Sequence, residues 1–128
     1  MNDRLIKTIV LGNGLILEIY DQSRKIAGGR WLVKMAVKID IPIDRLHLGD
    51  NLNKQVSLNS LQESLGNYIR YEQKRERNFV GDQQKNAVFD DLVASFLAST
   101  REYLSHPHFA VRCAMREYLR QPQRKSKL

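Results

Sequence analysis

Arginine side chains near the C-terminus are the residues whose type and spacing best suit a binding chemistry. Arg112, Arg116 and Arg120 recur at every fourth position, and Arg124 continues the series. On an α-helix this spacing places the side chains on one ridge, which also includes Phe109. Guanidinium groups bind phosphate or carboxylate through a planar fork, and an aromatic ring beside them can stack on a base. The pattern predicts an anion-binding ridge, with nucleic acid or an acidic protein as the partner.

The uneven distribution of charge along the chain supports this prediction. The 128 residues carry a formal net charge of +7, and the segment from Arg112 to the end accounts for +5 of it. The rest is close to neutral, so the sequence favours an anionic partner for one element rather than for the whole fold. A solvated helix face is the alternative interpretation. The cations would then stabilise the helix C-terminus by about 0.3–1 kcal/mol, and Phe109 would pack against the preceding helix.

A second candidate for anion binding is the polar segment 21–30, which joins two predicted strands. Arg24, Lys25 and Arg30 lie in it, close to a pair of glycines. Loops held by rigid strands often carry binding residues, so these three cations could surround an anion. The alternative is a solvated hairpin end whose charges only keep the protein soluble.

Histidine and cysteine residues form no catalytic or metal-binding pattern. His106 and His108 flank a proline and His47 is distant, whereas a metal site needs three or four converging ligands. Cys113 would need a base and an orienting partner to act as a nucleophile, and the sequence identifies neither. Neither pair of neighbouring glycines precedes a helix, as a phosphate-binding loop would. We therefore expect no catalytic residue, no metal and no cofactor, and the sequence favours a non-enzymatic protein.

Length and composition predict one soluble domain in the cytoplasm. Domains cluster around this length, so we expect one α+β domain over residues 1–121 and a basic flexible tail over 122–128. The single cysteine excludes an internal disulfide framework, which fits a reducing compartment. No apolar run approaches the roughly 20 residues of a membrane span, and the first residues lack the pattern of a signal peptide. We expect no membrane partner.

Four strands are the elements that must position these residues. Residues 5–11, 15–25, 30–41 and 67–79 are rich in β-branched residues or alternate in polarity. An Asn-Gly dipeptide follows the first of them, and it supplies the two residues with positive φ that a tight hairpin turn needs. The sequence thus predicts an antiparallel sheet of three to four strands, with sequential strands as neighbours.

The third strand indicates which face of the sheet is buried. Its odd-numbered side chains from Trp31 to Ile41 are apolar, while the other face carries Lys34, Lys38 and Asp40. This alternation is typical of a sheet covered on one side only. Apolar residues nevertheless fall on the outer face of the second and third strands, and they favour a second copy of the chain as its cover. These residues are Ile16, Tyr20, Leu32 and Ala36.

The fourth strand has one charged face and one mixed face. Charges of alternating sign run from Arg70 to Glu76, which predicts cross-strand ion pairs on the outer side. The inward face is apolar only near its ends, at Ile69, Tyr71 and Phe79. We therefore expect an edge strand, where charge discourages pairing with further strands.

A short helix is expected between the third and fourth strands, over residues 58–65. Ser60-x-x-Glu63 matches a capping box, in which the serine and glutamate side chains satisfy backbone N–H groups of the first turn. Gly66 suits the end of this helix.

Two longer helices are expected in the C-terminal third. Asp82 is the predicted N-cap of a helix over 82–105, whose broad apolar stripe suits packing across a sheet. Pro107 breaks this helix and is favourable as the first residue of the next, over 107–120. This last helix carries the arginine ridge.

These elements predict a two-layer α+β fold in which two C-terminal helices cover one face of the sheet. The predicted function is a non-enzymatic binding or regulatory module that contacts an anionic partner, such as nucleic acid, through the arginine ridge. Two alternatives stay open. One is a homo-oligomeric structural or interaction protein that uses the outer sheet face, and the other is a small-molecule-binding domain with a pocket between sheet and helices.

Overall fold

Five strands form one antiparallel sheet in the computed structural model, which describes residues 3–46 and 57–120. The central strand is β4: β5 pairs with one of its edges, and β2 and β3 share the other. β1 pairs with the free edge of β2. The predicted α+β class and antiparallel sheet are confirmed. The strands are β1 (Arg4–Val10), β2 (Ile16–Asp21), β3 (Arg24–Ala27), β4 (Arg30–Pro42) and β5 (Tyr68–Gly81).

The strand predicted over 15–25 is divided into β2 and β3. At the division, the Gln22 N–H donates to the Lys34 carbonyl (2.9 Å), and the Lys34 N–H donates to the Ser23 hydroxyl (2.9 Å). A side-chain oxygen thus replaces a backbone acceptor, which interrupts the strand while leaving the Lys34 backbone groups satisfied. Both pieces stay on the same edge of β4.

Glycines with positive φ form the two hairpin turns. Between β1 and β2, the Leu11 N–H donates to the Leu15 carbonyl (2.8 Å) and the Gly14 N–H donates to the Leu11 carbonyl (2.9 Å). Gly14 alone has a positive φ there (90°), so the expectation of two such residues in the Asn-Gly pair is wrong. Between β3 and β4, Gly28 (57°) and Gly29 (72°) both have positive φ, as a type I′ turn requires.

A β-bulge in β5 changes the direction of Phe79. The β4–β5 register shifts between the pairs Trp31–Val80 and Val33–Arg77, which leaves one extra residue in β5. Phe79 lies in this stretch with a φ of 60°. Val80 is buried, whereas the Phe79 side chain is 66% exposed. The prediction that Phe79 faces inward is wrong, because a period-two pattern reverses at a bulge.

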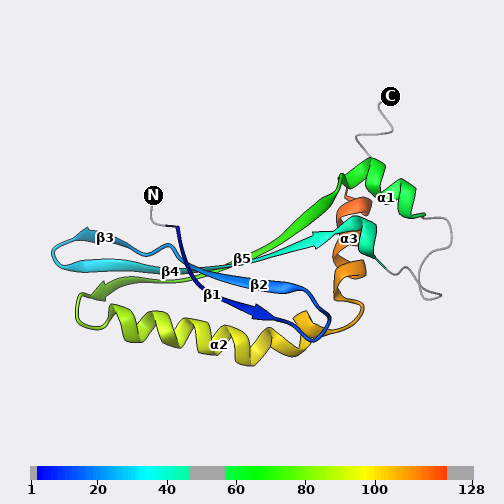
Figure 1. The fold of residues 1–128 in the computed structure, drawn as a ribbon. Helices are drawn as coiled ribbons and strands as arrows, with labels where there is room; N and C mark the ends of the chain where they lie inside the picture. Colours follow the sequence, from blue (N-terminus) through cyan, green and yellow to red (C-terminus); the bar gives the residue numbers. More distant parts are fainter. Residues whose placement is uncertain (1–2, 47–56, 121–128) are drawn as a thin grey trace.

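The helix α2 (Lys85–Ser105) covers one face of the sheet (Figure 1). Its N-cap is Gln84 and not the predicted Asp82, whose carboxylate instead accepts a hydrogen bond from Trp31 Nε1 (2.7 Å). The apolar stripe packs on β4 and β5, and each large side chain so buried contributes about 1.5–3 kcal/mol. The buried residues of α2 are Phe89, Leu92, Phe96 and Leu104.

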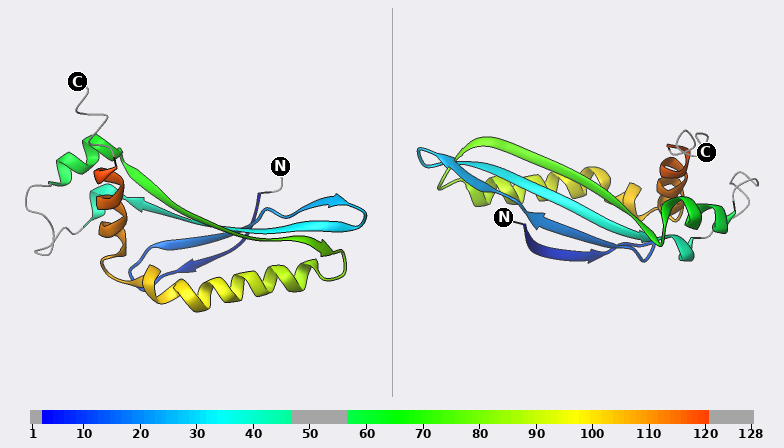
Figure 2. Two further views of the ribbon diagram at one scale, coloured as in Figure 1. Left: turned by 180° about the vertical axis from the view of Figure 1, so that it is seen from behind. Right: turned by 90° about the horizontal axis from the view of Figure 1, so that it is seen from above.

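Three further elements lie together at one end of the sheet, opposite the β3–β4 hairpin (Figure 2). They are η1 (Ile43–Arg45), α1 (Leu58–Leu65) and α3 (Phe109–Leu119), and α1 contacts both of the others. The helices predicted over 58–65 and 107–120 are therefore present, the second beginning two residues later than expected. We call this region, together with the β1–β2 turn, the α3 end.

The cap of α1 lies earlier than predicted. The Ser57 hydroxyl accepts a hydrogen bond from the Ser60 N–H (3.1 Å), so Ser57 is the N-cap and Ser60 is inside the helix. The predicted capping box is wrong by one turn. Gly66 ends the helix with a φ of 85°, which confirms its predicted role.

Candidate functional site

Phe109 does not belong to an exposed ridge. Its side chain is fully buried, and its ring makes edge-to-face contacts with Tyr71 (5.2 Å between centroids) and Tyr103 (5.3 Å). Since Phe109 is the first residue of α3, the ring joins α3 to β5 and α2. The prediction that it contacts an anionic partner is wrong, and the alternative of packing against the preceding helix is confirmed.

The predicted arginines of α3 differ in their surroundings. Arg112 and Arg116 are exposed, and an Arg116 Nη2 atom lies 3.5 Å from the Tyr103 hydroxyl. This hydrogen bond raises the pKa of the Arg116 guanidinium, a group that is charged in proteins even without such a partner. Arg120 instead pairs with Glu117 (2.9 Å), which compensates its charge. Arg124 and the predicted tail over 122–128 lie outside the described residues.

An arginine of β5 joins this group although the sequence pattern did not single it out. The Arg75 guanidinium carbon lies 5.3 Å from the centroid of the Phe96 ring, on the helix-covered side of the sheet. Burial raises the pKa of Tyr71, and the nearby Arg75 and Arg116 groups act in the opposite direction. Both guanidinium groups are therefore close to the same tyrosine. The available signal was the absence of acidic residues from the inward side of β5.

We define the arginine face as Arg75, Arg112 and Arg116 with the tyrosines Tyr71 and Tyr103. None of its three arginines pairs with a carboxylate among the described residues. Arg116 is held by a phenol oxygen. Arg75 is held by a ring and by neutral amide groups, since it donates to the Gln73 side chain (3.3 Å) and the Lys74 carbonyl (2.9 Å). The three arginines therefore form no ion pair among the described residues, although Glu117, which pairs with Arg120, also acts electrostatically on Arg116.

The outer face of the sheet differs from the arginine face because its charged side chains form ion pairs. The predicted cross-strand pairing of β5 is present between Arg70 and Asp40, at 2.7 Å. Lys38 pairs with Asp3 (3.1 Å), and Lys74 lies 3.9 Å from Glu72 within β5. Cations and anions on this face are balanced, so it offers little field to an anionic partner.

The second predicted anion site lies at the far end of the molecule from α3. Arg24, Lys25 and Arg30 are exposed on the β3–β4 hairpin (Figure 1). The Arg30 guanidinium carbon lies 5.1 Å from the centroid of the Phe79 ring. We call this hairpin, with the adjoining end of β5, the tip. Because the tip lies at the opposite end from Arg112 and Arg116 of α3, these cations cannot form one compact anion site.

The predicted oligomer interface is not a continuous apolar surface. Ala36 is fully buried between neighbouring strands, where Tyr20 and Lys74 oppose it with longer side chains, so its predicted contact with another chain is wrong. Leu32 and Tyr20 are half-buried, and Lys38 Nζ lies 4.4 Å from the centroid of the Tyr20 ring. Ile16 is exposed. It stays a candidate contact, together with the exposed Val10 that opposes it on β1.

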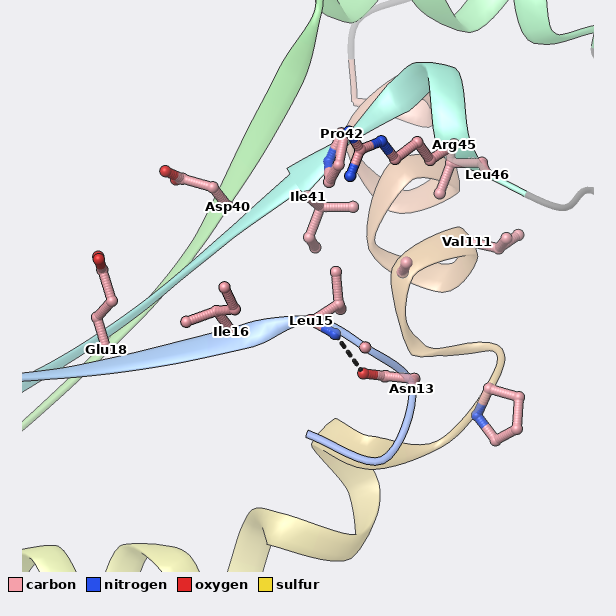
Figure 3. A pocket seen from close by; sticks show the side chains of 13 residues that line it. Asn13, Leu15, Ile16, Glu18, Asp40, Ile41, Pro42, Arg45, Leu46 and Val111 are labelled. Carbon is pink, nitrogen blue, oxygen red and sulfur yellow. Dashed lines mark hydrogen bonds between the residues drawn. The ribbon is translucent and has the colours of Figure 1, made fainter. Parts of the chain in front are cut away.

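A cavity of about 440 Å³ lies at the α3 end, where β2 and β4 separate (Figure 3). The β2–β4 ladder ends at the pair Leu17–Ile39, whereas β4 continues on β5 to Pro42. The first turns of α3 and the end of η1 complete its wall. A pocket between sheet and helices was one of the alternatives left open by the sequence, but no periodicity could have located this one.

His106 forms part of a turn, and Cys113 belongs to the protein core. The His106 Nδ1 atom accepts a hydrogen bond from the His108 N–H (3.0 Å) in the turn before α3. Cys113 is buried, which raises the pKa of its thiol. Within residues 3–46 and 57–120, no three His, Cys, Asp or Glu side chains gather as a metal site would require. No helix in these ranges has the length and apolar content to cross a membrane.

Comparison of the chain with known protein families, with curated proteins and with solved structures finds no match.

Proposed function

We propose that the protein is a non-enzymatic binding module whose arginine face contacts nucleic acid. The observation that carries this proposal is that Arg75, Arg112 and Arg116 lie beside aromatic rings and form no ion pair among the described residues. The outer face, in contrast, pairs its charges. Arginines that lack a carboxylate partner need break no ion pair to bind phosphate through their planar fork.

The aromatic groups favour nucleic acid over an acidic protein. Tyr103 is 41% exposed and lies beside Arg116, so its ring is accessible to an unstacked base. Stacking on an aromatic side chain contributes about 1–3 kcal/mol per base and tolerates any sequence. An acidic peptide would use the guanidinium groups but would have no such use for the ring. We therefore expect single-stranded nucleic acid to bind with little sequence preference.

Salt dependence of affinity is the primary test. The measurement is fluorescence anisotropy of a labelled oligouridylate titrated with the protein at several salt concentrations. Neutralising three phosphates of a single strand gives a slope of about −2 in a plot of log affinity against log salt. The affinity should thus fall roughly 20-fold between about 50 and 200 mM salt. Salt-insensitive binding, or none at low salt, contradicts the proposal.

Variants on the two faces of the same sheet provide the matched comparison. Arg75→Gln with Arg116→Gln removes two charges from the arginine face, and Lys74→Gln with Lys34→Gln removes two from the outer face. The first pair should weaken binding and reduce the salt slope by about 0.7 for each arginine lost, the value for one phosphate contact on a single strand. The second pair should leave the slope unchanged. Equal losses from both pairs would mean a diffuse attraction, and polyglutamate competing as well as oligouridylate would indicate an acidic protein partner; either result rejects the nucleic-acid site.

A further inference from the structure

We propose that the cavity at the α3 end binds a small apolar monocarboxylate, an aliphatic or aromatic acid, with the carboxylate on Arg45. The cavity volume of about 440 Å³ lies within the range of roughly 300–1,000 Å³ typical of ligand pockets. The site is separate from the arginine face, so this inference does not depend on the proposed nucleic-acid binding.

The walls of the cavity are apolar because of the way the strands separate. Beyond the Leu17–Ile39 pair, β2 leads into the β1–β2 turn and no longer pairs with β4, whereas β4 stays paired with β5. Side chains that would be neighbours if the β2–β4 pairing continued line the space between the two strands instead. α3 forms the rear wall of the cavity. The apolar lining includes Leu15, Ile16, Ile41, Leu46, Ala110 and Val111. Such a lining accepts the body of an apolar molecule at about 25 cal/mol for each Å² removed from water.

The charged groups that line the cavity determine whether it favours an anionic or a cationic ligand. Asp40 is satisfied by Arg70 through two hydrogen bonds, at 2.7 and 3.2 Å. Glu18 accepts a hydrogen bond from the Tyr20 hydroxyl (3.0 Å). Arg45 pairs with no carboxylate among the described residues. The group available to a ligand is therefore a cation.

The positions of these groups select a single carboxylate and give it a direction. The Arg45 side chain extends over Pro42 at one side of the cavity, while Glu18 and Asp40 project from the strands at the other (Figure 3). A carboxylate placed on Arg45 keeps away from both anions, and the apolar body then lies over Leu15 and Ile16. A second carboxylate at the far end would be repelled by Glu18. A dicarboxylate is therefore excluded on charge.

Three probes of equal chain length test the proposed chemistry. Octanoate, 1-octanol and octylammonium are titrated, below their micelle concentrations, into ¹⁵N-labelled full-length protein, and amide shifts are followed by NMR. Octanoate should shift the amides of Leu15, Ile41 and Val111, and it should bind at least about tenfold more tightly than 1-octanol, which is the gain expected from one charge-assisted hydrogen bond. Octylammonium should bind no better than the alcohol. Equal affinities for the three probes, or octanoate shifts confined to other surfaces, would overturn the inference.

Two variants on neighbouring elements separate this site from the arginine face. Arg45→Gln should weaken octanoate binding about tenfold and leave 1-octanol unchanged. Arg112→Gln removes the same charge from α3 outside the cavity lining, so it should retain octanoate binding while weakening oligouridylate binding. The reverse pattern, with Arg112 governing octanoate, would reject the carboxylate site.

A third variant tests the cavity itself. Ala110→Leu adds bulk at the cavity wall and should abolish binding of both octanoate and 1-octanol, with a wild-type NMR spectrum elsewhere as the check on folding. Undiminished octanoate binding by a folded Ala110→Leu protein contradicts the inference. If this variant does not fold, the Arg45→Gln comparison still decides the question.

Discussion

The two ends of the molecule place an arginine beside an aromatic ring in different ways. At the α3 end, Phe109 is buried between Tyr71 and Tyr103, and Arg116 lies on the outer side of Tyr103. At the tip, Phe79 is exposed and the Arg30 guanidinium lies against its ring. The phenylalanine is therefore part of the core at the α3 end, whereas at the tip it lies on the surface.

This difference assigns distinct roles to the two ends. The α3 end has a buried aromatic cluster that fixes α3 against β5 and α2, so it can hold side chains in a defined geometry. The tip relies on its strand pairing and on exposed cation–aromatic contacts, which contribute only about 0.5–1 kcal/mol each. We place the specific binding surfaces at the α3 end for this reason.

Removing one phenylalanine from each end is the strongest test of the contrast. Phe109→Ala should destabilise the protein by about 3–5 kcal/mol, because it leaves a cavity among well-packed rings. The same deletion at Phe79, which is 66% exposed, should change the free energy of unfolding by less than about 1 kcal/mol. Urea denaturation measures both values. Similar losses at the two sites would show that the ends are anchored alike.

The second largest loss of stability is expected from removing the hydrogen-bonding side chain of Asn13, at the α3 end. Asn13 Nδ2 donates to the Leu104 carbonyl (2.8 Å) and to the His106 carbonyl (3.0 Å), and its Oδ1 accepts from the Leu15 N–H (3.1 Å). We call these three hydrogen bonds the Asn13 clamp. Asn13→Ala should cost about 1–2 kcal/mol, because carbonyls at the end of α2 lose their donor. Thermal unfolding compared with Asn59→Ala, an exposed site in α1, provides the measurement, and an unchanged melting temperature would contradict the role of the clamp.

A smaller effect is expected from the turn at the tip. Gly29 has a φ of 72°, and no atom lies within 4 Å of the position that an alanine Cβ would occupy. Gly29→Ala therefore meets no clash but holds alanine in an unfavourable backbone conformation, which should cost about 1 kcal/mol. Gly28→Asn is the control, because asparagine tolerates this conformation in type I′ turns. Chemical denaturation should distinguish the two variants, and equal stabilities would argue against conformational strain as the cause.

The smallest expected effect is a difference between the natural protein and Cys113→Ala in how stability depends on pH. Burial raises the pKa of the Cys113 thiol at the α3 end. The unfolded chain then releases this proton at a lower pH than the folded chain, so stability is complete below the ordinary thiol pKa and declines as the pH rises above it. The free energy of unfolding, followed from neutral to alkaline pH, should decline less steeply in Cys113→Ala. Parallel profiles for the two proteins would reject this contribution.

Sequence periodicity was sufficient to predict most elements of this fold, but not the division of the strand over 15–25 into β2 and β3, nor η1. The alternation from Trp31 to Ile41 identified the buried face of β4, and the apolar stripe of α2 identified its cover. These patterns extend over many residues, so single exceptions do not change them. The edge position of β5 followed from its charged outer face in the same way.

Features that depend on one hydrogen bond or one tertiary contact were not predictable. The bulge at Phe79 reverses a side chain without any change in composition, and Ser57 rather than Ser60 caps α1 because of a single bond. Phe109 and Arg75 illustrate the same limit at the candidate site. Helix spacing placed Phe109 with the arginines, but its ring is buried against Tyr71 of β5 and Tyr103 of α2. Arg75 comes from a distant part of the sequence and reaches this region because α2 packs on β5, where its guanidinium lies against Phe96.

The Asn13 clamp has a consequence for the order of folding events. It joins residues separated by 91 and 93 positions, so it forms only after most of the chain is already arranged. An interaction that is absent from the folding transition state slows unfolding rather than accelerating folding. We therefore expect the clamp to join the β1–β2 hairpin to the end of α2 late in folding and to lengthen the lifetime of the folded α3 end.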